Sequence, residues 1–320
     1  MEIPFLKRLR KFISEHGALV ALVILLVVCA LSSADFRRPQ NLLNILRQNA
    51  YTGIIAIGMT FIIIGGGIDL SVGSLFALAG GLGILAMNAL PASSPILALA
   101  VGILVALTVG MAGGALNGAL VTLGKLPPFI ATLGTMSIFR SLILHLGNAG
   151  LIGTSNEPFS RLDAHKFLGL NTVVWIFLLC TALGSVVLYR TRYGRHLCAV
   201  GGHERVARYA AIRVNLVKFI SYTACGLLCG ISALLQGARL SSISSSSAGA
   251  GCELDAIAIA IIGGTSMAGG KGTIWGALIG AMILGIISNI LVMWSIAPNL
   301  QGLIKGLVII VAVLIQRGKK

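Results

Sequence analysis

Charged side chains are scarce in this sequence of 320 residues. Asp, Glu, Lys and Arg make up 10% of the chain and hydrophobic residues 57%, whereas a soluble domain carries about 25% charged residues. So few charges cannot cover a surface exposed to water. The apolar residues also form runs long enough to cross about 30 Å of hydrocarbon, which takes about 20 helical residues. The composition therefore excludes an ordinary soluble protein and predicts an all-α membrane protein.

Acidic residues are the scarcest charged class. The 9 Asp and Glu face 24 Lys and Arg, which gives a net charge of +15 and could serve nucleic acid, anionic lipid or membrane topology. The basic residues lie mainly in short segments between apolar runs, and no basic stretch is interleaved with aromatic residues. We therefore expect the charge to fix topology, with membrane lipid and no nucleic acid as a partner.

Metal-binding patterns are also missing. The six cysteines form no C-x-x-C pair, and the five histidines are scattered. Cys225 and Cys229 would share one face of a helix, but no histidine or carboxylate lies near them in sequence. The cysteines are expected to be small buried side chains, and we predict no metal site and no cofactor.

The apolar runs predict about ten membrane-spanning helices. The predicted spans are residues 17–33, 49–66, 70–88, 96–118, 127–146, 171–189, 219–237, 253–269, 273–294 and 300–316. The first run, with basic residues before it and Ser32, Ser33 and Ala34 after it, also resembles a secretory signal peptide. Because it is longer than most signal cores and matches the later spans, an uncleaved first helix is the preferred interpretation.

An even number of spans places both ends of the chain in the cytoplasm. This arrangement puts 16 of the 24 basic residues on the cytoplasmic side, as the positive-inside rule favours. They are Lys7, Arg8, Arg10, Lys11, Lys125, Arg190, Arg192, Arg195, Arg205, Arg208, Arg213, Lys218, Lys271, Arg317, Lys319 and Lys320. Shifting the topology by one helix would place the densest basic segment, residues 190–218, outside.

Two glycine-rich segments interrupt the apolar pattern. They read GGGIDLSVG at residues 65–73 and GGTSMAGGKG at residues 263–272, and the similar sequences FALAG and GALIG follow them. Duplicated halves with interrupted helices are a recurring transporter design, although glycines can also simply let helices pack closely. We predict two weakly related halves, with pathway or gate candidates in both segments: Asp69, Ser71, Gly73, Thr265 and Ser266.

Ionisable residues at membrane depth are few. Asp69 is read either as an N-cap of the following helix or as a lining of the pathway. Glu253 and Asp255 fall in a first helical turn, where carboxylates favour the helix dipole, and Lys305 lies near a helix end, where it can snorkel. The sequence shows no relay suited to proton coupling.

No nucleotide-binding loop is present either. Residues 264–272 resemble one, but Thr265 stands where a Walker A motif needs glycine and Gly272 where it needs Ser or Thr. Active transport would therefore need a separate ATPase or an ion gradient.

The polar segment at residues 204–212 predicts a short helix with one apolar side, suited to docking a partner protein or lying on anionic lipid.

Four ordered motifs resemble the permeases of ribose, xylose, arabinose and related sugar ABC importers. They are GIDLSVGS at residues 67–74, LPPFIATLGT at 126–135, TRYGR at 191–195, and ELDAIA with GGTS at 253–258 and 263–266. The resemblance runs from about Asn41 to the end. It implies one permease domain over residues 1–320, in the bacterial inner membrane, without enzyme activity of its own.

The resemblance also implies partners. They are a second permease copy or paralogue, a cytoplasmic ATP-binding subunit and a periplasmic sugar-binding protein. The ATPase-coupling loop would comprise Gly201, Gly202, His203, Glu204, Ala207, Arg208 and Ile212. His203, Val206 and Ala211 depart from the family pattern, where Asn, Ala and Gly are common.

The leading hypothesis is a passive conduit for a monosaccharide, switched between outward and inward access by its ATPase partners. A second hypothesis keeps the family but changes the cargo to a nucleoside or a furanose signalling molecule. A third is an ion-coupled secondary carrier with Asp69 as the coupling carboxylate. An enzyme in the membrane is disfavoured because no nucleophile, base and orienting group can be assembled from the motifs.

Overall fold

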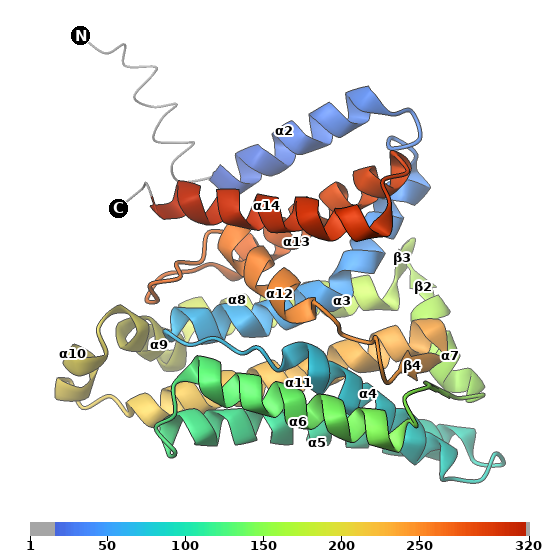
Figure 1. Ribbon diagram of the computed structural model, residues 1–320, viewed down its shortest axis with the longest axis horizontal. Helices are drawn as coiled ribbons and strands as arrows, with labels where there is room; N and C mark the ends of the chain where they lie inside the picture. Colours follow the sequence, from blue (N-terminus) through green and yellow to red (C-terminus); the bar gives the residue numbers. More distant parts are fainter. Residues whose placement is uncertain (1–16, 318–320) are drawn as a thin grey trace.

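The computed structural model describes residues 17–317 as a bundle of helices with two small antiparallel sheets (Figure 1). The long helices are α2 (Gly17–Ser32), α3 (Pro39–Ile64), α4 (Val72–Asn88), α5 (Pro95–Thr122), α6 (Pro128–Leu146), α8 (Thr172–Arg190), α11 (Val214–Leu240), α13 (Ile274–Met293) and α14 (Pro298–Arg317). The short helices are α7 (Glu157–Ala164), α9 (Arg192–Gly202), α10 (Glu204–Tyr209) and α12 (Cys252–Ile262).

Every predicted apolar span contains a helix, and the protein is an all-α polytopic membrane protein. Five helices, α5, α6, α8, α11 and α13, are long and apolar enough to cross a membrane. The apolar helices α2 and α4 are shorter, with 16 and 17 residues. The count of ten spans stays a prediction.

The two largest errors in the predicted boundaries are at the start of α3 and at the end of α12. Helix α3 begins at Pro39 rather than near residue 49, because proline at the first helical position supplies a preset backbone angle. Helix α12 ends at Ile262 rather than 269, because Gly264 turns the backbone to a φ of 93°. With 11 residues, α12 extends only about 16 Å and cannot cross a bilayer by itself.

Several elements between the spans were not predicted. Strand β1 (Leu151–Gly153) pairs with β4 (Ser242–Ser244), and β2 (Lys166–Phe167) pairs with β3 (Leu170–Asn171), both antiparallel. Helix α7 follows β1 and is held against α3, where Asp163 contacts the Arg47 guanidinium and accepts a 3.2 Å hydrogen bond from the Tyr51 hydroxyl. The buried carboxylate of Asp163 is thus bound by both Arg47 and Tyr51, and this holds α7 against α3.

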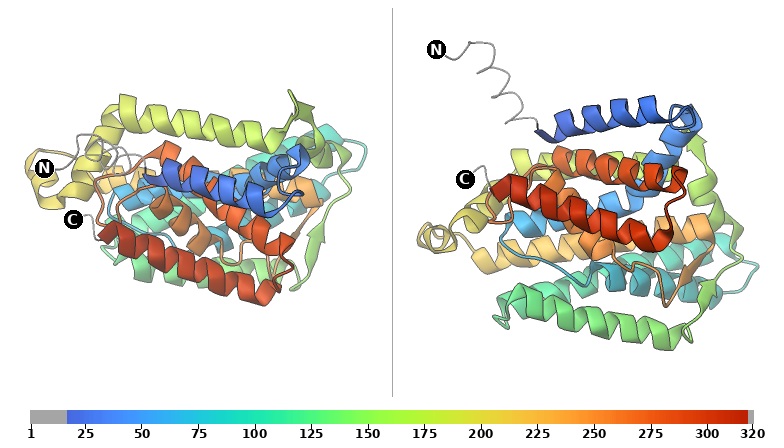
Figure 2. Two further views of the ribbon diagram at one scale, coloured as in Figure 1. Left: turned by 90° about the horizontal axis from the view of Figure 1, so that it is seen from above. Right: turned by 45° about the horizontal axis from the view of Figure 1, so that its top comes forward.

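The bundle has two distinct ends. Figures 1 and 2 show α9 and α10 at one end, here called the α10 end, and α7, β2 and β3 at the other, the α7 end. The Gly17 end of α2 and the Arg317 end of α14 both lie at the α10 end. Helices α6 and α14 lie on one face of the bundle and α8 on the opposite face (Figure 2).

Helices α5 and α11 are in direct backbone contact at the centre of the bundle. A Cβ atom added to Gly226 would collide with the Gly110 carbonyl oxygen, and one added to Gly114 with the Tyr222 carbonyl oxygen. Small residues let membrane helices approach this closely, since packing rather than the hydrophobic effect drives their association. Helix α11 packs against α3 and α4 as well, so it forms the core of the fold.

Candidate functional site

The two glycine-rich segments end helices α3 and α12 in the same way. Backbone hydrogen bonds run from Gly65 to Phe61, from Gly66 to Ile63 and from Gly67 to Ile62, with N···O distances of 2.9–3.1 Å. The same three bonds, at 2.8–2.9 Å, run from Gly263 to Ile259, from Gly264 to Ile261 and from Thr265 to Ala260. Gly66 and Gly264 both have positive φ, at 77° and 93°. The two segments are thus equivalent helix ends, as the sequence repeat suggested.

The N-termini of α4 and α12 meet inside the bundle. A Cβ atom added to Gly73 would collide with the Gly249 carbonyl oxygen and lie 2.6 Å from Oε2 of Glu253. Gly249, with a φ of 70°, equally leaves no room for a side chain because the Gly73 carbonyl lies against it. Helices α4 and α12 therefore start at one shared point, here called the helix-start junction. Exposed irregular backbone of this kind is tolerated at membrane depth only inside protein or beside water.

A buried polar network holds the segment before α4. Oδ1 of Asp69 accepts hydrogen bonds from the backbone N–H and the hydroxyl of Ser71, at 2.8 and 2.7 Å. Asn117 on α5 donates to Oδ2 of Asp69 at 3.1 Å and to the Ser71 hydroxyl at 2.7 Å. Thr135 on α6 donates to Oδ1 of Asn117 at 2.7 Å. The network ties residues 65–71 to two neighbouring helices.

Asp69 does not occupy the N-cap of α4, because Ser71 does. The side chain of Asp69 is 1% exposed, and the carboxylate forms a turn with Ser71 before the helix begins. The N-cap interpretation is therefore wrong in position, although the carboxylate does accept a backbone N–H. In this conformation Asp69 is enclosed within the wall of the bundle.

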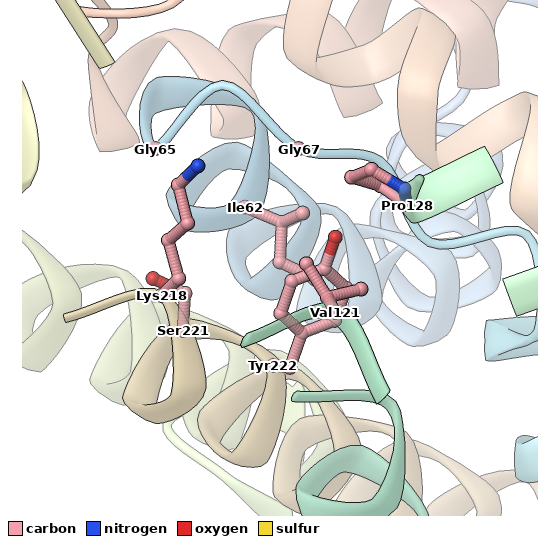
Figure 3. A pocket seen from close by; sticks show the side chains of 8 residues that line it. All are labelled: Ile62, Gly65, Gly67, Val121, Pro128, Lys218, Ser221 and Tyr222. Carbon is pink, nitrogen blue, oxygen red and sulfur yellow. The ribbon is translucent and has the colours of Figure 1, made fainter. Parts of the chain in front are cut away.

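A small cavity lies beneath the same segment, with a volume of about 10 Å³. Figure 3 shows Lys218 and Tyr222 extending from α11 toward Gly65 and Gly67. The Tyr222 hydroxyl donates a 3.1 Å hydrogen bond to the carbonyl of Ile68. The cavity has room for no more than about one water molecule.

Thr265 and Ser266 lie in a separate loop at the α10 end. The N–H of Gly270 in this loop donates a 2.8 Å hydrogen bond to the carbonyl of Ile64, the last residue of α3. Thr265 is buried, whereas Ser266 is half-buried and accepts from the N–H of Ala268 at 3.3 Å. The two predicted groups of pathway residues thus occupy different levels of the bundle.

The predicted coupling loop forms α9, α10 and the turn between them. Gly201 packs so closely on Ile64 that a Cβ there would collide with its carbonyl oxygen. Gly202 and His203 are exposed, and His203 precedes α10 as its N-cap residue. The predicted helix at 204–212 ends at Tyr209, because Ala211 adopts a φ of 57° and the N–H of Ile212 bonds back to Ala207.

Helix α10 is fixed to α11 by charged groups. The carboxylate of Glu204 accepts hydrogen bonds from Lys218 at 2.6 Å and from Arg208 at 2.8 Å. These bonds, that of Lys218 first, hold the pKa of Glu204 below its ordinary value of 4.5. On the outer side, Val206 is 60% and Tyr209 90% exposed, whereas Ala207 is buried. The helix therefore presents an apolar surface at the α10 end.

Several contacting residues could not be identified from their motifs. Asn117 and Tyr222 lie within apolar spans far from residue 69 in sequence, and Thr135 ends the LPPFIATLGT motif, which gave it no role at this site. A lone amide inside a 28-residue apolar helix, as Asn117 is in α5, was the one available signal. Among the described residues, no cluster of His, Cys, Asp and Glu could hold a metal ion.

A larger hollow of about 920 Å³ opens at the α7 end. Its wall comes from the connection between α4 and α5, from β1 and the start of α7, and from the end of α11. The lining includes the polar residues Asn88, Asn156, Ser241 and Ser242. Connecting segments form most of its wall, and no residue of the helix-start junction lines it.

Comparison with known proteins shows the family. The family described as "Branched-chain amino acid transport system / permease component" matches residues 41–313. The chain belongs to this permease family. The ribose import permease RbsC of Escherichia coli (strain K12) is 38% identical over 97% of this chain and 96% of its own length. RbsC of Bacillus subtilis (strain 168) is 40% identical over 95% and 92%, and the E. coli D-allose permease AlsC 35% identical over 96% and 92%.

No solved structure matches this permease. Membership of the family makes the chain a transport subunit and not an enzyme, with ATP hydrolysis in a separate subunit. The permease is a multi-pass membrane protein.

Proposed function

We propose that this permease forms the translocation pathway for a monosaccharide, a ribose-like pentose or related sugar, in an ABC importer of the bacterial inner membrane. One observation supports it above the others: the N-termini of α4 and of the 11-residue helix α12 meet at a polar junction inside an apolar bundle. Binding sites in transporters are typically built from such discontinuous helices. The choice of a ribose-like sugar as the cargo is supported by the 38–40% identity to ribose import permeases.

The α10 end is assigned to the cytoplasm. The basic segment at residues 190–218 lies there, and the positive-inside rule favours that side. Ten crossings follow if residues 65–71 with α4, and residues 241–251 with α12, each cross the membrane once. Both chain ends then lie in the cytoplasm.

In the conformation described, both glycine-rich segments are held against their neighbours. Asp69 and Ser71 lock the segment before α4 to α5 and α6, and Gly73 is closed against Gly249. Thr265 and Ser266 belong to the equivalent segment near the cytoplasm. Access is proposed to switch when these two segments move relative to α5 and α11, since packed cores change between discrete arrangements rather than deforming continuously.

The coupling partner is a cytoplasmic ATP-binding subunit that docks on α9 and α10. The support is the exposed apolar surface of Val206 and Tyr209 beside the charged groups of α10. Loop residues Gly201 to Ile212 would carry the contact.

A second permease, either a copy or a paralogue, is proposed to complete the conduit. Arg140 on α6 and Glu253 and Asp255 on α12 are half-buried, and the exposed Gly66 lies in the irregular segment before α4. Such polar groups cannot face hydrocarbon at low cost. A periplasmic sugar-binding protein would deliver the substrate at the α7 end.

Family membership leaves no role for an ion-coupled carrier. Asp69, the coupling residue of that hypothesis, is held by donors on both of its oxygens. A nucleoside or a furanose signalling molecule remains the alternative cargo.

The test is reconstitution of the permease with the ATP-binding subunit and binding protein that copurify with it. ATP-dependent uptake of a labelled pentose, across a panel of sugars and nucleosides, is the expected result. Uptake of nucleosides alone would change the cargo, and uptake driven by a proton gradient without ATP would overturn the proposal.

A further inference from the structure

The connection between α11 and α12 is unusually rich in hydroxyl groups. Residues 241–251, here called the serine loop, read SSISSSSAGAG. Three of the hydroxyls form a cluster: Ser247 donates to Ser244 at 2.8 Å, and Ser244 and Ser246 lie 3.2 Å apart. Ser246 and Ser247 are exposed. The cluster therefore presents hydroxyl groups that can still donate and accept hydrogen bonds.

The serine loop descends into the bundle from the α7 end. It starts at β4, which pairs with β1, and reaches the helix-start junction where Gly249 lies against Gly73. Figure 1 shows this loop on the same face as α6 and α14. Exposed hydroxyls are costly against hydrocarbon, which favours a position of Ser246 and Ser247 at the proposed pathway rather than against lipid.

A charged residue inside a helix anchors the loop. Arg140, six residues or about 9 Å before the end of α6, donates through Nη1 to the carbonyls of Ser245 at 3.1 Å and Ser246 at 3.5 Å, and through Nη2 to Ala248 at 2.8 Å. Glu253 lies in the first turn of α12, into which the serine loop leads. An arginine at membrane depth is expensive and therefore marks a functional position.

These groups match the chemistry of a sugar. Vicinal sugar hydroxyls both donate and accept hydrogen bonds, and serine hydroxyls and a carboxylate supply both partners. A nucleobase would favour an aromatic platform for stacking, and the serine loop contains no aromatic residue.

We infer that Ser246 and Ser247 form a contact site for the passing monosaccharide, with Arg140 as the positioning residue that holds their loop in place. Glu253 borders the site at the helix-start junction. This inference rests on the proposed function and names the residues that the substrate touches.

The test uses the complete importer in vesicles, with ribose and its mono-deoxy analogues at saturating concentration. In the Ser246→Ala/Ser247→Ala variant, ribose transported per ATP hydrolysed should fall about two- to tenfold, the loss expected for one or two neutral hydrogen bonds. The preference for ribose over one of the deoxy analogues should shrink in parallel, because the lost hydroxyls no longer distinguish the two sugars.

Two controls separate contact from structure. Ser288→Ala on α13 removes a hydroxyl that only bonds to the carbonyl of Leu284 and should leave both readouts unchanged. Ser246→Thr/Ser247→Thr keeps the hydroxyls and should restore the preference. Wild-type transport and wild-type sugar preference in the double alanine variant would overturn the inference alone. Failure of the wild-type complex to move any sugar would overturn the proposed function as well.

Discussion

Asn117 on α5 donates a 3.1 Å hydrogen bond to the carboxylate of Asp69, which lies 48 positions earlier in the chain. The bond joins the segment before α4 to the central helix pair, and a second bond from Thr135 adds α6. The fixed order of donors and acceptors in this buried network makes its members sensitive to small chemical changes.

The first prediction concerns the pairing of donors with acceptors in this network. Asp69→Asn should lower the stability of the purified permease by about 1–3 kcal/mol, because an amide NH₂ would then face the NH₂ of Asn117. The double variant Asp69→Asn/Asn117→Asp restores a donor facing an acceptor and should regain part of the loss. Thermal unfolding in detergent measures both effects. An Asp69→Asn variant as stable as the wild type would contradict the network.

The second prediction concerns the ion pair of α10. Glu204→Gln should cost less than about 1 kcal/mol near pH 7, because the carboxylate is 40% exposed. The lowered pKa of Glu204 means that the ion pairs stabilise the fold above its ordinary pKa of 4.5 and lose their effect as the pH falls through the folded value.

The measurement is therefore a comparison of melting temperatures for wild type and Glu204→Gln across a pH series. Their difference should be present at neutral pH and vanish in acid below the ordinary pKa. A difference that grows on acidification would show that the ion pairs do not stabilise α10.

The third prediction concerns the anchor of the serine loop. Arg140→Lys keeps the positive charge but loses the forked geometry that reaches three carbonyls. Hydrogen exchange of the amides at residues 245–248 should become faster, while the amides of α11 keep their protection. Unchanged exchange in the serine loop would mean that Arg140 does not hold it.

The fourth prediction concerns the contact of α5 and α11. Gly226→Ala should destabilise the permease by about 1–3 kcal/mol, since the new methyl group collides with the Gly110 carbonyl. Gly134→Ala on α6 is the matched control, because nothing lies within 4 Å of the added atom. Thermal stability in detergent should separate the two variants, and equal stability would disprove the tight contact.

The helices were the most predictable part of the fold. Apolar runs located all the long helices, because lipid demands continuous apolar segments with internally satisfied backbone. Helix α9 was missed, since its Arg and His residues suggested a loop; its buried residues Gly194, Leu197 and Val200 recur every three positions on one face. Helix α7 and the strands depend on tertiary pairing that local sequence does not encode.

The site was predictable only in part. Glycine segments and Asp69 were visible as interruptions of an apolar pattern, and the equivalent helix ends at Gly65 and Gly263 confirm that they correspond structurally. The contacts of Asn117 with Asp69 and with Thr135 could not be predicted, because contacts between distant helices depend on how the bundle packs. For the same reason, the sequence could not show that Asp69 and Thr265 lie at different depths in the bundle.

The glycine contacts of α5 and α11 also have a mechanical consequence. The backbones of α5 and α11 touch directly, without a layer of side chains between them. We therefore expect the two helices to move together as one rigid unit. One tip of α11 follows directly after α10, and the other, about 40 Å away at Leu240, is the root of the serine loop. A displacement of α11 at the α10 end should therefore be transmitted to the serine loop at the α7 end, with α5 moving alongside.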